Sequence, residues 1–128
     1  MLSDRDRRII DAPNFASVAT LMPDGSPQVS TIWIDRDGDD VLFNTAERRV
    51  KTDNLRRDGR VAISVFDQED HDEQVIVRGT VVDMTTEGAD DHIDFLAKKY
   101  LGADTYPFRD PDEQRVIVRV RPDHVSDG

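Results

Sequence analysis

The sequence predicts a β-rich fold in which six strands form a closed or split barrel. Two observations favour this fold class. Short runs suited to strands alternate with evenly placed turn signals, and few segments carry the period of a helix. A chain of 128 residues without repeats or a Pro-rich linker is expected to form a single domain, residues 1–128. The strands are expected at residues 15–22, 28–35, 41–45, 60–66, 75–84 and 114–121.

The first segment predicts a short helix. Ser3 and Asp6 have the spacing of a capping box, with Asp in place of the usual Glu. Ile9 and Ile10 supply apolar side chains, and Pro13 ends the helix.

The second strand has two mixed faces. Pro23 through Ser26 form a turn, because Pro presets φ and Gly tolerates a positive φ, so strands 15–22 and 28–35 form a hairpin. Neither face of 28–35 is purely apolar, so one end of this strand can belong to the core while the other lines a site. The faces are Val29, Thr31, Trp33 and Asp35, and Gln28, Ser30, Ile32 and Ile34.

The later helices and strands are predicted where the spacing of apolar residues changes. Residues 46–57 predict a short helix ended by Asp58-Gly59, and residues 86–101 predict a longer one ended by Gly102. Within the fifth strand, Gly79 indicates a bulge or a close approach of backbone. Residues 103–113 are expected to form a loop.

Composition excludes several classes of function. With no cysteine, the chain has no disulfide, no thiolate nucleophile and no cysteine-ligated metal. A net charge of −10 argues against attraction to nucleic acid or to an anionic membrane. The charged N-terminus lacks the apolar run of a signal peptide, and no stretch is long enough to cross a bilayer, so a cytoplasmic location is expected.

The histidines predict no metal site. His71, His92 and His124 match no local metal motif, and we expect each on the surface. Acidic pairs such as Asp90-Asp91 are interpreted as solvated charges.

One stretch reverses the sign of the chain's charge. Residues 48–60 contain six positive side chains and two negative ones. Such an inversion suits an anionic ligand, and the helix that follows the third strand points its positive end the same way. A solvated basic helix paired with neighbouring carboxylates is the alternative. Thr45 either caps this helix or bonds to a phosphate oxygen.

A series of motifs then occurs in order along the chain. They are Val18-Ala-Thr, Pro23-Asp-Gly-Ser-Pro-Gln, Ile32-Trp-Ile-Asp, Asp37-Gly-Asp, Leu42-Phe-Asn-Thr-Ala, Arg49-Val-Lys-Thr-Asp-Asn-Leu-Arg-Arg-Asp, Arg78-Gly-Thr-Val-Val-Asp and Arg119-Val-Arg-Pro. Together they resemble the pyridoxamine 5'-phosphate oxidase-like split-barrel superfamily, and most of all its small members that use coenzyme F420, a deazaflavin. The resemblance covers residues 9–122, and the stretch from Arg49 is its most specific part.

The resemblance implies a six-stranded split barrel of the FMN-binding type and a homodimer whose cofactor sites are shared between subunits. It implies an F420-dependent oxidoreductase that transfers a hydride between reduced F420 and an unsaturated organic substrate. The implied neighbours of the cofactor ring are Gln28, Ser30, Thr31, Ile32 and Trp33. The implied phosphate site comprises Thr45, Arg49, Lys51, Thr52 and Asn54. No residue stands out as a catalytic acid.

Alternatives stay open at this point. The same fold and basic cluster suit an FMN-dependent oxidoreductase, or a noncatalytic module that binds a flavin-like or haem-like ligand. Trp33 can equally be a core residue, and Gln28 and Ser30 can be exposed. Relatives often carry aromatic residues where this chain has the polar segment 67–75, so its aromatic wall is expected from Tyr100, Tyr106 or Phe108.

Overall fold

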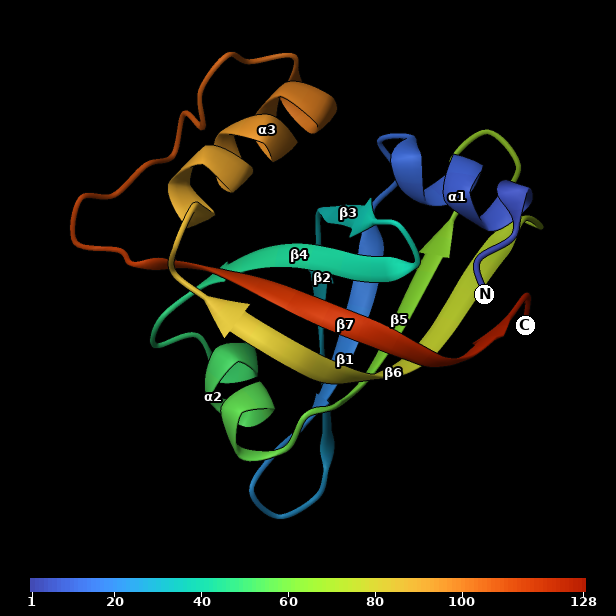
Figure 1. Ribbon diagram of the computed structural model, residues 1–128, viewed down its shortest axis with the longest axis horizontal. Coiled ribbons are helices and arrows are strands. Elements are labelled where there is room, and N and C mark those ends of the chain that lie inside the picture. The colour runs from blue at the N-terminus through green and yellow to red at the C-terminus, as the bar shows by residue number, and fades with distance from the viewer.

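The computed structural model describes residues 1–128 and contains one sheet of seven strands with three helices around it (Figure 1). The helices are α1 (Asp4–Asp11), α2 (Val50–Arg57) and α3 (Ala89–Leu101). The strands are β1 (Ala16–Leu21), β2 (Pro27–Ile32), β3 (Ile34–Asp37), β4 (Asp40–Ala46), β5 (Arg60–Phe66), β6 (Gln74–Thr85) and β7 (Arg115–Ser126). None of the helices is long and apolar enough to cross a membrane.

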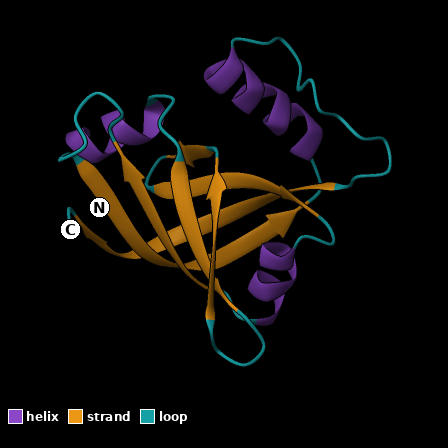
Figure 2. Ribbon diagram, turned by 180° about the vertical axis from the view of Figure 1, so that it is seen from behind, coloured by secondary structure: helices purple, strands orange, loops and turns teal.

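The strand order makes the sheet curl. In space the strands follow the order β2-β1-β5-β6-β7-β4-β3, and all neighbours are antiparallel. The edge strands β2 and β3 are separated in the chain by Trp33 alone. Two residue steps of extended backbone span at most about 7 Å, so the two edges must lie close together at that point. Figures 1 and 2 show the resulting curved sheet, which confirms the split barrel.

The predicted single strand 28–35 is wrong, and this is why the sheet has seven strands instead of six. β2 pairs with β1, whereas β3 pairs with β4. At the break, the Ile34 N–H donates to the Tyr100 hydroxyl over 2.9 Å, and that hydroxyl donates to Asn14 O over 2.7 Å. The Trp33 ring stacks on Tyr100 with 5.2 Å between centroids. A helix distant in sequence therefore ends one strand and begins the next.

Other boundaries differ less. Residues 46–49, predicted as helix, form the end of β4 and a turn in which Arg48 adopts the left-handed region at φ 73°. This conformation costs about 1–2 kcal/mol for a residue with a side chain. α3 begins three residues later than predicted, after Gly88, and β7 continues to Ser126 rather than ending at 121.

The core fills the barrel with branched aliphatic side chains. Val18, Ile63, Val77 and Val118 come from four strands and are at most 1% exposed. Helix α1 adds Ile9 and Ile10, and its predicted capping box between Ser3 and Asp6 is confirmed. This helix packs on β3, β5 and β6, whereas α2 packs on β1 and α3 packs on β4 and β7.

Gly79 lies where two backbones meet, as the sequence predicts. A Cβ at this position would stand 2.6 Å from Arg121 O and 2.7 Å from a Val120 methyl carbon. The register between β6 and β7 also shifts at Arg78/Gly79. Only glycine fits there without moving β7.

Lys99 joins three elements from a half-buried position. Its Nζ donates to Ile10 O over 2.7 Å and to Ile34 O over 2.6 Å, which ties α3 to the end of α1 and to β3. Burial lowers the pKa of Lys99 to about 8, although Asp35 and Asp11 act in the opposite direction.

We predict that Lys99 makes stability rise with pH. Between about pH 8 and 10.5 the unfolded chain holds more protons on this lysine than the folded chain, so the free energy of unfolding increases. Urea unfolding at pH 7 and at pH 9.5 gives the free energy of unfolding of wild type and of Lys99→Met. The value for wild type minus that for the variant should increase by about 1 kcal/mol between the two pH values, after allowing for solvent screening. Tyr100, whose pKa burial raises to about 12, titrates above this window. An equal difference at both pH values would contradict the assignment.

Candidate functional site

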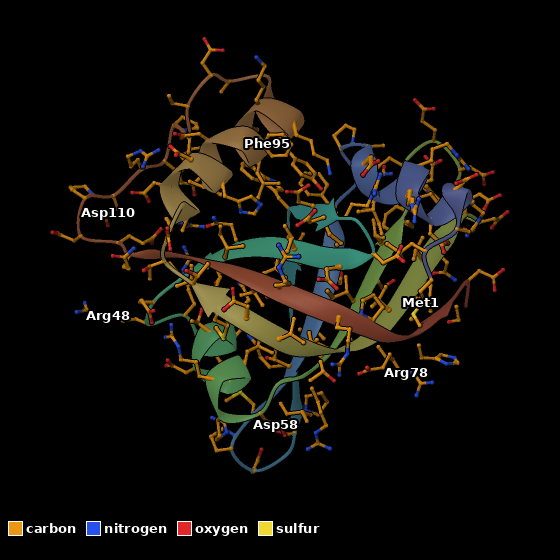
Figure 3. The ribbon with its side chains drawn as sticks, in the orientation of Figure 1. Met1, Arg48, Asp58, Arg78, Phe95 and Asp110 are labelled. Carbon is orange, nitrogen blue, oxygen red and sulfur yellow. The ribbon has the colours of Figure 1, made fainter.

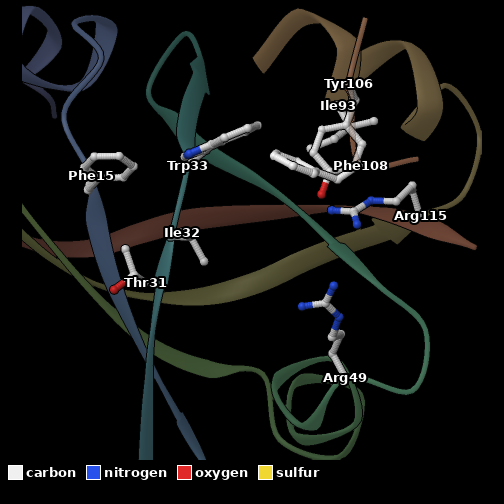
Figure 4. A pocket seen from close by; sticks show the side chains of 9 residues that line it. All are labelled: Phe15, Thr31, Ile32, Trp33, Arg49, Ile93, Tyr106, Phe108 and Arg115. Atoms are coloured by element: carbon white, nitrogen blue, oxygen red, sulfur yellow. The ribbon is translucent and has the colours of Figure 1, made fainter. Parts of the chain in front are cut away.

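A cavity of about 200 Å³ opens beside the junction of β2 and β3 (Figure 4). Its walls come from that junction, the start of α2, α3, the loop after α3 and the start of β7. Four predicted site residues, Thr31, Ile32, Trp33 and Arg49, line it. The other lining residues are Phe15, Ile93, Tyr106, Phe108 and Arg115.

Aromatic rings form one side of the cavity. Tyr106 meets Trp33 edge to face with 6.0 Å between centroids, and Phe108 meets Tyr106 at 5.6 Å. Asp94 of α3 fixes this loop, since its Oδ1 accepts from Tyr106 N over 2.8 Å. Of the three aromatic residues expected at a wall, Tyr106 and Phe108 line the cavity, while Tyr100 stacks on Trp33 outside its lining.

Positive groups form another part of the lining. The guanidinium groups of Arg49 and Arg115 point into the cavity from α2 and β7 (Figure 4). Lys51 lies beside them: burial, and then the charges of Arg49 and Arg115, lower its pKa. Glu113 bridges the two arginines, with Oε1 accepting from Arg115 and Oε2 3.4 Å from Arg49 Nη2. The cluster thus already attracts a carboxylate.

The rest of the basic stretch does not face the cavity. Arg56 pairs with Glu47, and Arg60 pairs with Asp58 at 2.7 Å. Arg48 points away from the sheet (Figure 3). Both interpretations of the stretch therefore apply, each to different residues. Arg56 and Arg60 are paired at the surface, whereas Arg49 lines the cavity and Lys51 lies close enough to interact electrostatically with Arg49 and Arg115.

Thr45, Thr52 and Asn54 are buried and use their side chains within the protein. The hydroxyls of Thr45 and Thr52 lie 3.0 Å apart, and that of Thr52 donates to Ala46 O over 2.7 Å. Asn54 Nδ2 donates to Thr20 Oγ1 over 3.0 Å. Thr45 does not cap α2, whose N-cap is Arg49. The three side chains hold α2 against β4 and β1, and none of them lines the cavity.

Gln28 and Ser30 present polar atoms with no partner. The Gln28 Oε1 and the Ser30 Oγ are buried and form no hydrogen bond. Neither residue is exposed, so that alternative is wrong. A buried polar group left unpaired costs about 1–3 kcal/mol, and neither residue lines the cavity.

Two residues of this region escaped sequence reasoning. Arg115 lies far from the basic stretch, and only the pairing of β4 with β7 brings it to the cavity. His92 was expected on the surface, which is wrong: its side chain is 10% exposed and its Nε2 lies 3.0 Å from Asp35 Oδ2. The position of His92 one helical turn before the apolar Leu96 was the available signal for its burial.

The curled sheet and the cationic, aromatic cavity at its split define a split-barrel protein. A family model described as pyridoxamine 5'-phosphate oxidase matches residues 2–127, and the chain belongs to this family. A solved F420 reductase is 30% identical, with a TM-score of 0.84, over 95% of this chain and 96% of that one. No curated protein matches the chain.

More distant solved structures share the fold alone. The conserved hypothetical protein Rv2991 from Mycobacterium tuberculosis is 20% identical, with a TM-score of 0.72, over 98% of this chain and 83% of that one. HupZ from Group A Streptococcus is 20% identical, with a TM-score of 0.67, over 98% of this chain and 92% of that one.

Proposed function

We propose that this protein is an F420-dependent oxidoreductase that transfers a hydride between reduced F420 and an unsaturated organic substrate. The observation that carries the proposal is the gathering of Arg49, Lys51 and Arg115 beside an aromatic cavity in a chain of net charge −10. Guanidinium and ammonium groups suit a phosphate. The similarity to an F420 reductase over nearly the whole chain favours a deazaflavin.

The chain's residues divide into two groups in this proposal. Arg49, Lys51 and Arg115 hold the phosphate, with Thr45, Thr52 and Asn54 supporting them at α2. Thr31, Ile32 and Trp33, which line the cavity, would hold the cofactor ring, with Gln28 and Ser30 of the same strand as its further neighbours. The reduced deazaflavin supplies the hydride. The protein binds, aligns the reactants and excludes water, and solvent delivers any proton.

FMN is the second candidate cofactor. The matched family is described as an oxidase of pyridoxamine 5'-phosphate, and FMN also carries a phosphate for the same cations. The cavity does not separate the two cofactors, because the cations recognise a group that both contain.

Direct titration tests the proposal. The purified protein is titrated separately with F420 and with FMN while cofactor fluorescence is followed, and the reduced form of the bound cofactor is then supplied with electron acceptors. We expect tighter binding of F420 and turnover with its reduced form. Tighter binding of FMN would instead identify the protein as an FMN-dependent oxidoreductase. Binding without turnover for any acceptor would leave a noncatalytic binding module, and binding of neither would overturn both assignments.

We also propose that a second copy of the chain completes the site. The cavity is smaller than the roughly 300–1,000 Å³ usual for small-molecule sites, so this chain supplies only part of the walls. The outer face of β1 and β5 carries the small residues Ser17, Ala19, Ala62 and Ser64, which leave a shallow groove bordered by Val29 at 63% exposure. A shallow groove of small side chains with an exposed valine at its border suits an isologous contact with the same face of another copy.

We predict a homodimer by light scattering at micromolar concentration. Val29→Asp introduces a charge into the proposed contact and should shift the species towards the monomer mass while weakening cofactor binding. Leu101→Asp, at an exposed position of α3, serves as the control and should stay dimeric. A wild-type protein that is monomeric throughout would contradict the shared site.

Lys51 provides the sharpest test of the phosphate site. We predict that Lys51→Ala weakens cofactor binding by about 1.5–3 kcal/mol, or roughly 10- to 150-fold, as expected for a hydrogen bond to a charged group. The variant should melt within a few degrees of wild type. Lys98→Ala, which removes an exposed lysine from α3, should bind normally. Lys99 is unsuitable as a control because its ammonium holds two backbone carbonyls. Equal weakening by both variants would show a nonspecific effect of charge.

A further inference from the structure

Asn44 of β4 connects the cavity to α3 through a buried amide. Its Nδ2 donates to Ala89 O over 2.9 Å and lies 3.2 Å from His92 Nδ1, both in α3. Its Oδ1 accepts from Arg115 Nε over 2.8 Å. The residue is 8% exposed, so its amide has little access to water. Both ends of the amide have partners within the protein.

The partners fix the direction of every bond in this group. A backbone carbonyl can only accept, so Ala89 O holds the Nδ2 end of Asn44 towards α3 and leaves Oδ1 facing Arg115. His92 Nδ1 then accepts from Asn44. Its ring proton is consequently on Nε2, where it donates to Asp35.

Arg115 is held on two sides by these contacts. Nε donates to Asn44 and Nη1 donates to Glu113, while the guanidinium carbon lies 5.4 Å from the centroid of the Tyr106 ring. Nη2 makes no hydrogen bond within the chain, and Figure 4 shows the guanidinium aimed into the cavity opposite Arg49. Both N–H groups of Nη2 are therefore left for a ligand.

We propose that Asn44 is a positioning residue that aims Arg115 at the phosphoryl group of the ligand. Without the acceptor at Nε, the guanidinium is free to rotate and place two of its donors on Glu113, a bidentate pairing that guanidinium groups favour. Such a rotation takes Nη2 out of the cavity. This inference rests on the proposed function for the identity of the ligand, but its anion-binding part can be tested without either cofactor.

A double-mutant cycle with inorganic pyrophosphate as the probe tests the coupling. Calorimetry on the purified dimer or monomer compares wild type, Asn44→Leu, Arg115→Met and the double variant, with circular dichroism confirming that each is folded. We expect Asn44→Leu to weaken binding about tenfold when Arg115 is present and less than about twofold when it is absent. An equal factor in both backgrounds, or wild type that does not bind pyrophosphate, would overturn the proposal.

Nitrogen NMR of the ligand-free wild-type protein gives a second measurement that no variant's folding can affect. We expect His92 as the tautomer protonated at Nε2 and an Arg115 Nε–H protected from exchange. The tautomer protonated at Nδ1, or an Arg115 Nε–H that exchanges as fast as that of the exposed Arg78, would show that the amide does not hold the guanidinium.

The outcomes separate this inference from the proposed function. The protein could bind pyrophosphate in a way that depends on Asn44 only through Arg115, and yet bind neither F420 nor FMN. That result would support the positioning role of Asn44 and refute the proposed oxidoreductase activity. A folded Asn44→Leu variant that binds F420 as tightly as wild type would refute the positioning role and leave the oxidoreductase standing.

Discussion

The hydrogen bond from the Ile34 N–H to the Tyr100 hydroxyl determines where the barrel splits. At that point the chain leaves one edge of the sheet and joins the other, with Trp33 between them. The stacking of Trp33 on Tyr100 then directs an aromatic ring to the cavity. Since Tyr100 also donates to Asn14 O, the same hydroxyl fixes the entry to β1. The position of the site is thus a consequence of how α3 packs on the barrel.

The cationic side of the cavity shows how a nearly buried charge is made tolerable. Arg115 is 8% exposed, and a buried guanidinium without partners would be strongly destabilising. Glu113 supplies the opposite charge, and Asn44 supplies a neutral acceptor. A neutral acceptor orients the group without cancelling its charge, which leaves electrostatic attraction for a ligand. Arg49 is more exposed and needs less support.

Local chemistry was predictable from the sequence, and contacts between distant segments were not. The capping box at Ser3 depends only on residues that are neighbours in the chain. The close approach at Gly79 was indicated by the residue type, because a glycine inside a strand leaves room for another backbone. Trp33 looked like the middle of a strand because alternation continues through it. The burial of His92 and the arrival of Arg115 at the cavity depend on the packing of α3 and on the pairing of β4 with β7.

The local reversal of charge has a kinetic consequence. At separations of about one Debye length, a protein of net charge −10 repels an anionic ligand, and only close to the cavity do Arg49, Lys51 and Arg115 dominate the field. Added salt screens the long-range repulsion and so speeds encounter. The same salt weakens the short-range attraction and speeds escape. The association and dissociation rates of a phosphorylated ligand therefore both increase with ionic strength, and its residence time is longest in dilute buffer.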